Sequence, residues 1–317
     1  MRQPPPITQI LRFPLTGGLA LLACGVTFAW HAGYSIAPIT PTALAPALLP
    51  IRFITTILPH INIFHLFFNV YWLWVFGTLL EERFGHTHFA LIVILLALGS
   101  SGAEWAFAFG GVGLSGVGYG LFGMLVVLSR YDTRFSNAID LQTVLLFVGW
   151  FFLCIFMTFQ NIMPVANVAH GAGAILGLIL GWIVVCPRNR RSVPIAILAV
   201  VMILIGLGCT TFRPLINFSR DAPAEYAYAA DIAFKDDRDD LAEAYLVQAV
   251  RFRAAAASHW YNLGVARWHL KHFADAVQPV QHAVELDPSN KQFEETLRKF
   301  KEYLATQTSP TQPASRP

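Results

Sequence analysis

Four polar side chains with catalytic potential interrupt otherwise apolar stretches of the sequence. His65 and Asn69 lie four residues apart among leucine and phenylalanine, so on a helix they share one face. Ser115 lies among glycines in Gly-Leu-Ser-Gly, and His170 is followed by glycines at four-residue spacing. A serine with a histidine base can perform nucleophilic catalysis, and amide groups nearby can bind an oxyanion. Taken singly, each motif is explained at least as well by helix packing.

The elements that must position these residues are membrane-spanning helices. The chain is 55% hydrophobic and only 13% charged, far from the composition of a soluble globular protein. A helix that crosses a bilayer needs about 20 mostly apolar residues. We predict seven such spans, at residues 14–37, 62–80, 88–110, 112–129, 139–160, 165–186 and 193–212. A cleaved signal ending near Cys24 is an alternative for the first span, but the apolar run continues through Trp30.

Arginine placement predicts how the spans are oriented, because cytoplasmic connections retain positive charge. With the N-terminus in the cytoplasm, eight of the arginines that flank the spans lie inside, against Arg52, Arg213 and Arg220 outside. Seven crossings then leave the C-terminal region outside the cytoplasm. We therefore expect a multi-pass protein of a bacterial inner membrane. The net charge of +3 is a sum over an apolar region and a soluble one, so it gives no reason to expect nucleic acid as a partner, since proteins that bind nucleic acid concentrate Lys and Arg on one face.

This orientation brings the four candidate residues to one side of the membrane. Spans two, four and six all enter from the outside, so His65, Asn69, Ser115 and His170 lie at similar depth. Small residues at four-residue spacing allow close helix approach and are found in spans four and six. They are Gly116 and Gly120 in span four and Gly173 and Gly177 in span six. Close packing there would bring His170 within hydrogen-bond reach of Ser115.

Together, these residues resemble the signature of the rhomboid family of intramembrane serine proteases. The motifs are H-x-x-x-N in the second span, G-x-S-G in the fourth and A-H-x-x-G-x-x-x-G in the sixth. The matching positions are His65, Asn69, Gly113, Ser115, Gly116, His170, Gly173 and Gly177. The similarity covers roughly residues 50–186 and includes Leu79–Gly85 at the end of the second span. The family's Trp-Arg pair in the first outer loop is not evident, although Arg52 lies nearby.

The resemblance implies an all-α, polytopic membrane bundle with a rhomboid-like six-helix core, here with a seventh C-terminal span. It implies hydrolysis of a peptide bond in or beside a transmembrane segment of membrane-protein substrates within the lipid bilayer. Ser115 would be the nucleophile and His170 the base, with His65, Asn69 and the Ser115 amide binding the oxyanion. Gly113, Gly116 and Tyr119 would support the site, and Tyr119 shares a helix face with Ser115.

Three further expectations concern how the site works. Asp132 and Asp140 lie at the inner side and Glu104 lies in the third span, so we predict a Ser-His dyad without a third acid. We expect no cofactor and no metal. By family analogy, the gate involves span five and the loop at residues 160–164.

Two other functions remain open at this stage. The first is a catalytically inactive rhomboid-like protein that binds membrane clients, against which the presence of both Ser115 and His170 argues. The second is a metal or transport site built from His60, His65 and His170. Labelling by a fluorophosphonate probe would distinguish them from the protease.

The C-terminal region has the composition of a soluble helical domain. We divide the chain into a protease domain at 1–212, a connector at 213–224, a repeat domain at 225–306 and a disordered tail at 307–317. Residues 257–290 resemble a 34-residue tetratricopeptide repeat, and a weaker copy precedes them. We expect this domain to bind a protein partner, with a solubilising appendage as the alternative. Its histidines, at positions 259, 269, 272 and 282, are expected to form a solvated face.

Overall fold

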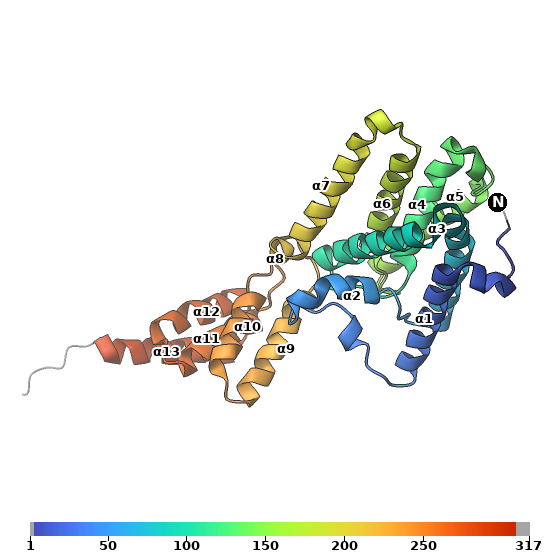
Figure 1. Ribbon diagram of the computed structural model, residues 1–317. Coiled ribbons are helices and arrows are strands. Elements are labelled where there is room, and N and C mark those ends of the chain that lie inside the picture. The colour runs from blue at the N-terminus through green and yellow to red at the C-terminus, as the bar shows by residue number, and fades with distance from the viewer. Residues whose placement is uncertain (1–2, 309–317) are drawn as a thin grey trace, which may run out of the picture. The chain divides into compact units, whose positions relative to one another are not determined.

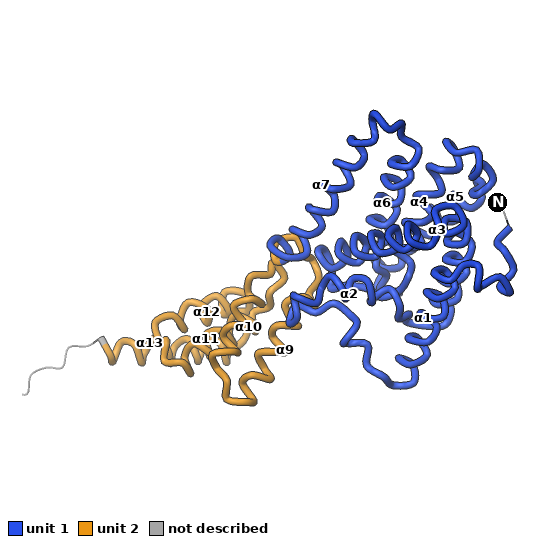
Figure 2. Tube along the Cα trace, viewed as in Figure 1, with its two compact units in different colours: residues 1–213 blue, residues 214–317 orange. Residues whose placement is uncertain are grey.

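The structure, a computed structural model, describes residues 3–308. The chain divides into two compact units, residues 1–213 and 214–317 (Figure 2). All regular secondary structure in the described residues is helical (Figure 1), so the all-α prediction is confirmed.

The first unit holds the apolar helices. Its α-helices are α1 (Pro14–His31), α2 (Leu49–Thr55), α3 (Ile63–Phe107), α4 (Ser115–Tyr131), α5 (Leu141–Phe159), α6 (Asn167–Val185) and α7 (Ser192–Cys209). Its short 3₁₀ helices are η1 (Ile7–Arg12), η2 (Ala37–Ile39), η3 (Pro46–Leu48), η4 (Thr133–Phe135) and η5 (Arg188–Arg190). The short α8 (Arg213–Ile216) lies where the two units join.

Five helices, α1, α3, α5, α6 and α7, are long and apolar enough to cross a membrane. Helix α3 has 45 residues and would be about 67 Å long if straight, twice the thickness of a hydrocarbon core. Gly85, with φ 75° and ψ 166°, breaks it into two halves. With the 17-residue α4, the unit has the seven apolar segments that the sequence predicts.

Several span boundaries differ from the prediction by a few residues, and two of the differences are in the first and fourth spans. The first span ends at His31 rather than at residue 37. The fourth helix begins at Ser115 rather than at residue 112, because Gly113 adopts a φ of 114°, which a helix cannot contain. The second difference matters chemically, since it makes the serine the first residue of its helix.

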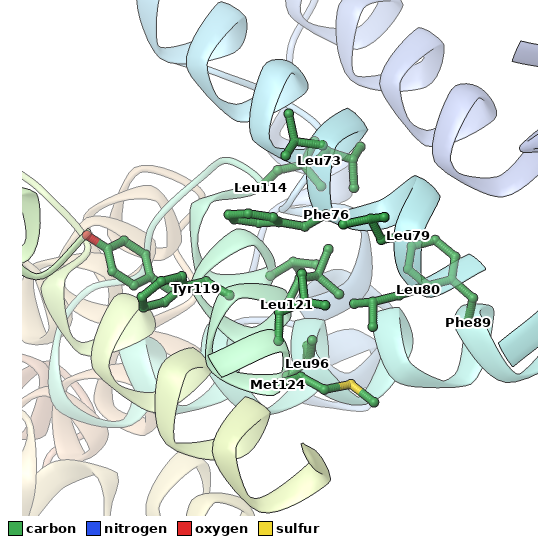
Figure 3. Close-up of a cluster of buried hydrophobic side chains, with 14 of the residues drawn as sticks. Leu73, Phe76, Leu79, Leu80, Phe89, Leu96, Leu114, Tyr119, Leu121 and Met124 are labelled. Carbon is green, nitrogen blue, oxygen red and sulfur yellow. The ribbon is translucent and has the colours of Figure 1, made fainter. Parts of the chain in front are cut away.

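The core of this unit forms where α4 packs against α3 and α6. Figure 3 shows Leu73, Phe76 and Leu80 from the first half of α3 converging with Leu121 and Met124 of α4. Leu96, from the second half of α3, reaches the same cluster and is fully buried. Helix α4 is therefore enclosed by other helices, as expected for the helix that carries a site at one end.

The contact between α4 and α6 depends on glycines that face the opposite backbone. A Cβ at Gly173 would overlap the carbonyl oxygen of Gly116, and a Cβ at Gly177 would overlap that of Gly120. Small residues at such contacts let helix backbones approach closely. This approach fixes the start of α6 beside the start of α4.

After α8, the described part of the second unit contains the helices α9 (Asp221–Lys235), α10 (Asp239–Ala249), α11 (Ala257–His269), α12 (Phe273–Leu286) and α13 (Lys291–Thr308). Small buried residues join α9 to α10, and Gly264 lets α11 approach the backbone of α12. The predicted connector is partly helical, since α9 begins at Asp221. Helix α13 runs two residues into the predicted tail, whose remainder lies outside the described residues. The tetratricopeptide assignment stays a prediction.

His259 contradicts the expected solvated histidine face. Its side chain is 8% exposed, and its Nδ1 atom accepts a hydrogen bond of 3.1 Å from the Ala256 amide. Acceptance requires an unprotonated Nδ1. Burial lowers the pKa of His259 below its usual value of 6.5, although the negative charge of Asp231 opposes this.

We expect acid to destabilise the second unit through His259. Because the folded state has the lower pKa, the unfolded chain binds more protons below pH 6.5, and stability falls as the pH drops through that value. Limited proteolysis of the full-length protein at pH 7.5 and 5.5 should show faster cleavage within α9–α12 at the lower pH. In a His259→Gln variant, this pH dependence should shrink. Equal dependence in both proteins would contradict the assignment, and the exposed His272 is the control position.

Candidate active site

Ser115 and His170 are hydrogen-bonded to each other. The Nε2 atom of His170, in the first turn of α6, lies 2.8 Å from the Oγ atom of Ser115, the first residue of α4. His170 is 3% exposed, and Ser115 is partly exposed. A nucleophile and base at this distance meet the geometric requirement for proton transfer.

Tyr119 fixes the plane of the imidazole. Its ring stacks on His170 with centroids 4.7 Å apart and an interplanar angle of 24°. Its hydroxyl donates a hydrogen bond of 3.0 Å to the carbonyl oxygen of Phe147 in α5. The tyrosine, one helical turn after Ser115, therefore links His170 to α5.

No carboxylate in the described residues completes a triad. The Nδ1 atom of His170 is buried and has no hydrogen-bond partner within residues 3–308. Asp132 bonds to Arg134, and Asp140 caps the start of α5. Glu104 approaches α6 but accepts from the Ala169 amide, at 2.9 Å, rather than from the imidazole.

His65, on the first half of α3, lies beside the serine loop, and Asn69 follows it by one helical turn. A Cβ at Gly113 would lie 2.6 Å from Cε1 of His65, so glycine is required there for space as well as for its positive φ. The amide nitrogen of Asn69 donates a bond of 2.8 Å to the backbone oxygen of His65. An amide nitrogen carries two hydrogens, so this bond leaves one for another acceptor.

Part of the chain is similar in sequence to known proteins. Residues 49–187 match the family model described as Rhomboid domain. Relatives named Rhomboid protease GlpG, from Salmonella paratyphi A and Salmonella typhi, are each 30% identical over 144 residues, covering 44% of this chain and 51% of the relative. The matches support the rhomboid family. The chain spans about half the length of the curated relatives it matches. The family match and the long apolar helices indicate a multi-pass integral membrane protein.

His60 has a role at this site that the sequence did not indicate. This fully buried side chain accepts a bond of 3.2 Å at Nε2 from the Leu114 amide, directly before the serine. Its Nδ1 atom lies 2.9 Å from the carbonyl oxygen of Leu58, so we assign the proton to Nδ1. With Nε2 engaged, His60 holds the serine loop and is a poor candidate for a metal ligand. The described residues contain no group of three histidine, cysteine or acidic side chains arranged to bind a metal.

The loop between α5 and α6 is tied to the start of α6. Thr158, near the end of α5, accepts a bond of 2.8 Å at Oγ1 from the Asn167 side chain and one of 3.3 Å from the Val165 amide. Asn161, in the loop, adopts a φ of 56°. This part of the rhomboid domain is therefore an ordered turn held beside the first turn of α6.

Proposed function

We propose that the protein is an intramembrane serine endopeptidase that cleaves a peptide bond in or beside the transmembrane segment of membrane-protein substrates. The observation that carries the proposal is the 2.8 Å contact between His170 Nε2 and Ser115 Oγ. It occurs inside a region that matches the Rhomboid domain and is similar to proteins named as proteases. A Ser-His pair at a helix start, with the histidine buried, has no simple packing explanation, because polar groups within membrane spans are costly.

The proposed chemistry is a two-step acyl transfer by a dyad. Ser115 Oγ attacks the scissile carbonyl carbon while His170 Nε2 takes its proton, and the protonated imidazole then gives that proton to the leaving amine. Water next attacks the acyl-enzyme and loses a proton to His170; the bond between the acyl carbon and Ser115 Oγ then breaks, His170 returns the proton to Oγ, and the carboxylic acid product leaves. With no acid on Nδ1, the stack with Tyr119 holds the ring in plane.

The oxyanion of the tetrahedral intermediate would meet three donors. The Ser115 amide is the first of α4, where amides lack an intrahelical acceptor. The second is the imidazole of His65, which lies against Gly113 of the same loop, and the third would be the remaining amide hydrogen of Asn69, one turn further along α3. Removal of one such donor typically lowers turnover about 100- to 1000-fold.

We propose the charge-derived topology for the whole chain: a bacterial inner membrane, a cytoplasmic N-terminus and a site that opens toward the outer side. The second unit would then be extracytoplasmic and would bind a protein partner. Helices α11 and α12 support this role, because their length and pairing are those of the predicted repeat.

A fluorophosphonate probe and a transmembrane substrate test the proposal together. In detergent, the wild-type protein should form an adduct at Ser115 and cleave the substrate, whereas Ser115→Ala should do neither. Absence of both signals in a folded wild-type protein would favour the inactive client-binding alternative. Cleavage that survives in Ser115→Ala and is abolished by chelators would favour a metal site.

A substrate segment that arrives through the lipid has to pass between α3 and α5. The seam there is aromatic: Phe68 meets Trp150 with ring centroids 6.4 Å apart, and Trp72 meets Phe147 at 4.9 Å. Phe68 and Trp150 are largely exposed, and Phe68 directly precedes Asn69. Opening the seam would cost the energy of such pairs, about 0.5–1.5 kcal/mol each.

We therefore expect the double variant Phe68→Ala, Trp150→Ala to raise kcat/KM for a transmembrane substrate about two- to tenfold. The rate of Ser115 labelling by a small fluorophosphonate should change less, because a small probe does not need the full opening. Phe152→Ala is the matched control, since Phe152 lies on α5, is 63% exposed and, among the rings of residues 3–308, pairs with the neighbouring Phe151. Unchanged or lower cleavage in the double variant would contradict a gate at this seam.

A further inference from the structure

Two buried carboxylates of α3 each cap the start of another helix. Glu81 accepts bonds from the Leu15 and Thr16 amides, of 3.0 and 2.8 Å, at the N-terminus of α1. Glu104 accepts a bond of 2.9 Å from the Ala169 amide at the N-terminus of α6. The two residues are 1% and 5% exposed. They do the same physical task, but only Glu104 acts on the helix that carries His170.

The start of α6 depends on Glu104 because it has no cap of its own. The N-cap residue, Ala166, offers no side-chain bond, so the amides of the first turn need an acceptor from elsewhere. Glu104 supplies it, accepting from Ala169 at 2.9 Å and also from the Val168 amide. The amide of His170 itself makes the first intrahelical bond, 3.2 Å to Ala166.

A buried carboxylate in this position is stabilised by its hydrogen bonds and by the helix. An ionised group in an apolar interior is costly unless it is hydrogen-bonded. The partial positive charge at a helix N-terminus favours an anion there. Glu104 therefore binds the first turn of α6 to the second half of α3 more firmly than a neutral side chain could.

The same carboxylate lies close to the loop that leads into Ser115. A Cβ at Gly111 would lie 3.7 Å from Cγ of Glu104 and 2.6 Å from Cβ of Ala166. The carbonyl oxygen of Gly111 accepts a bond of 2.8 Å from Thr56 Oγ1, and the Gly113 amide donates one of 3.1 Å to the Thr56 oxygen. Glu104 thus lies where the serine loop and the start of α6 meet.

We propose that Glu104 is a positioning residue: its carboxylate fixes the depth and rotation of the first turn of α6, and thereby the 2.8 Å contact of His170 with Ser115. This inference rests on the proposed protease function. Within residues 3–308, the carboxylate of Glu104 bonds to backbone amides of α6 and not to the imidazole or the serine hydroxyl. It acts through the Ala169 amide, one residue before the base. Loss of the anchor lets α6 shift, and a shift of about 1 Å at a catalytic group can cost 100-fold in rate.

The test compares Glu104→Ala and Glu104→Gln with the wild-type protein in detergent, on one transmembrane substrate. We expect Glu104→Ala to lower kcat about 100-fold with KM within about twofold. Glu104→Gln keeps an acceptor oxygen in place and should recover most of this loss, leaving kcat about three- to tenfold below wild type. The rate of Ser115 labelling by a fluorophosphonate should fall in the same order, because it reports the dyad without substrate binding.

Glu81→Ala is the control, since it removes a carboxylate that also accepts two amide bonds at a helix start. Glu81 has two further partners, Thr16 Oγ1 at 2.6 Å and His86 Nδ1 at 2.7 Å. Melting temperatures are measured for every variant, and rates are compared where all of them are folded. Glu81→Ala should lower the melting temperature while leaving kcat within about threefold of wild type.

Three outcomes would overturn the proposal. One is a kcat of Glu104→Ala within threefold of wild type. Another is a loss in Glu104→Ala that Glu81→Ala reproduces at an equal fall in melting temperature. The third applies if Glu104→Ala does not fold. In that case, a kcat of Glu104→Gln within twofold of wild type would contradict the positioning role. Failure of the protease function itself is distinct, because the wild-type protein would then neither cleave nor become labelled.

Discussion

Replacing Ser115 with alanine is expected to lower turnover of a transmembrane substrate by about a millionfold, and His170→Ala is expected to cost nearly as much. The two atoms act as one unit, since the proton that leaves Oγ has Nε2, 2.8 Å away, as its acceptor. The double variant should therefore be no slower than either single variant. Residual activity of about 1000-fold over the uncatalysed rate should remain from oxyanion binding.

Single-turnover cleavage of a purified substrate, with a detection limit near the uncatalysed rate, measures these losses. Ser129→Ala is the control on the same helix, because Ser129 only donates a 3.0 Å bond to the Val126 carbonyl, more than three turns from the site. It should cleave at the wild-type rate. If the losses in Ser115→Ala and His170→Ala multiplied in the double variant, the two residues would be acting independently, contrary to a dyad.

Much of the fold could be predicted from the sequence because a membrane-spanning helix is determined by its own run of apolar residues. The length of an apolar run fixes whether it can cross a bilayer, and the helices α5, α6 and α7 begin within two residues of their predicted starts. Boundaries set by a single residue were less predictable. Gly113 lies in an apolar stretch, and only its backbone conformation shows that the helix must begin after it.

The residues that meet at the site were predictable in kind, but their contacts were not. Ser115, His170 and Tyr119 could be grouped because charge sets the orientation of spans four and six. His60 could not be assigned, since its role depends on a loop that returns to it 54 residues later. Asn69 shows the same limit, because its amide bonds to its own helix in this structure.

Glu104 shows why a helix cap that comes from a distant part of the chain cannot be predicted from the sequence. The sequence marks it as an acid within an apolar span, which indicates a function but not a partner. Its partner is a backbone amide 65 residues away, and a backbone amide leaves no trace in residue type. In the second unit, the burial of His259 could not be predicted for a related reason, because its Nδ1 atom accepts a hydrogen bond from a backbone amide, that of Ala256.

Gly177→Ala is expected to be among the most damaging single methyl additions in the first unit. The added Cβ would overlap the carbonyl oxygen of Gly120 on α4, and a backbone atom cannot rotate away as a side chain can. Helix α6 would have to move off α4, which carries His170 away from Ser115. We expect a loss of stability of about 1–3 kcal/mol and a fall in kcat of about 100-fold.

The matched control is Gly171→Ala, on the same helix and adjacent to His170. Its Cβ would meet only the Phe151 ring, 3.7 Å away, which is an ordinary contact. Alanine also favours a helix over glycine by about 0.8–1.0 kcal/mol, so this variant should be as stable as wild type or more so. Melting temperature and kcat measured on both variants separate the two positions. Equal behaviour of Gly171→Ala and Gly177→Ala would mean that the close approach of α4 and α6 does not set the distance between the serine and its base.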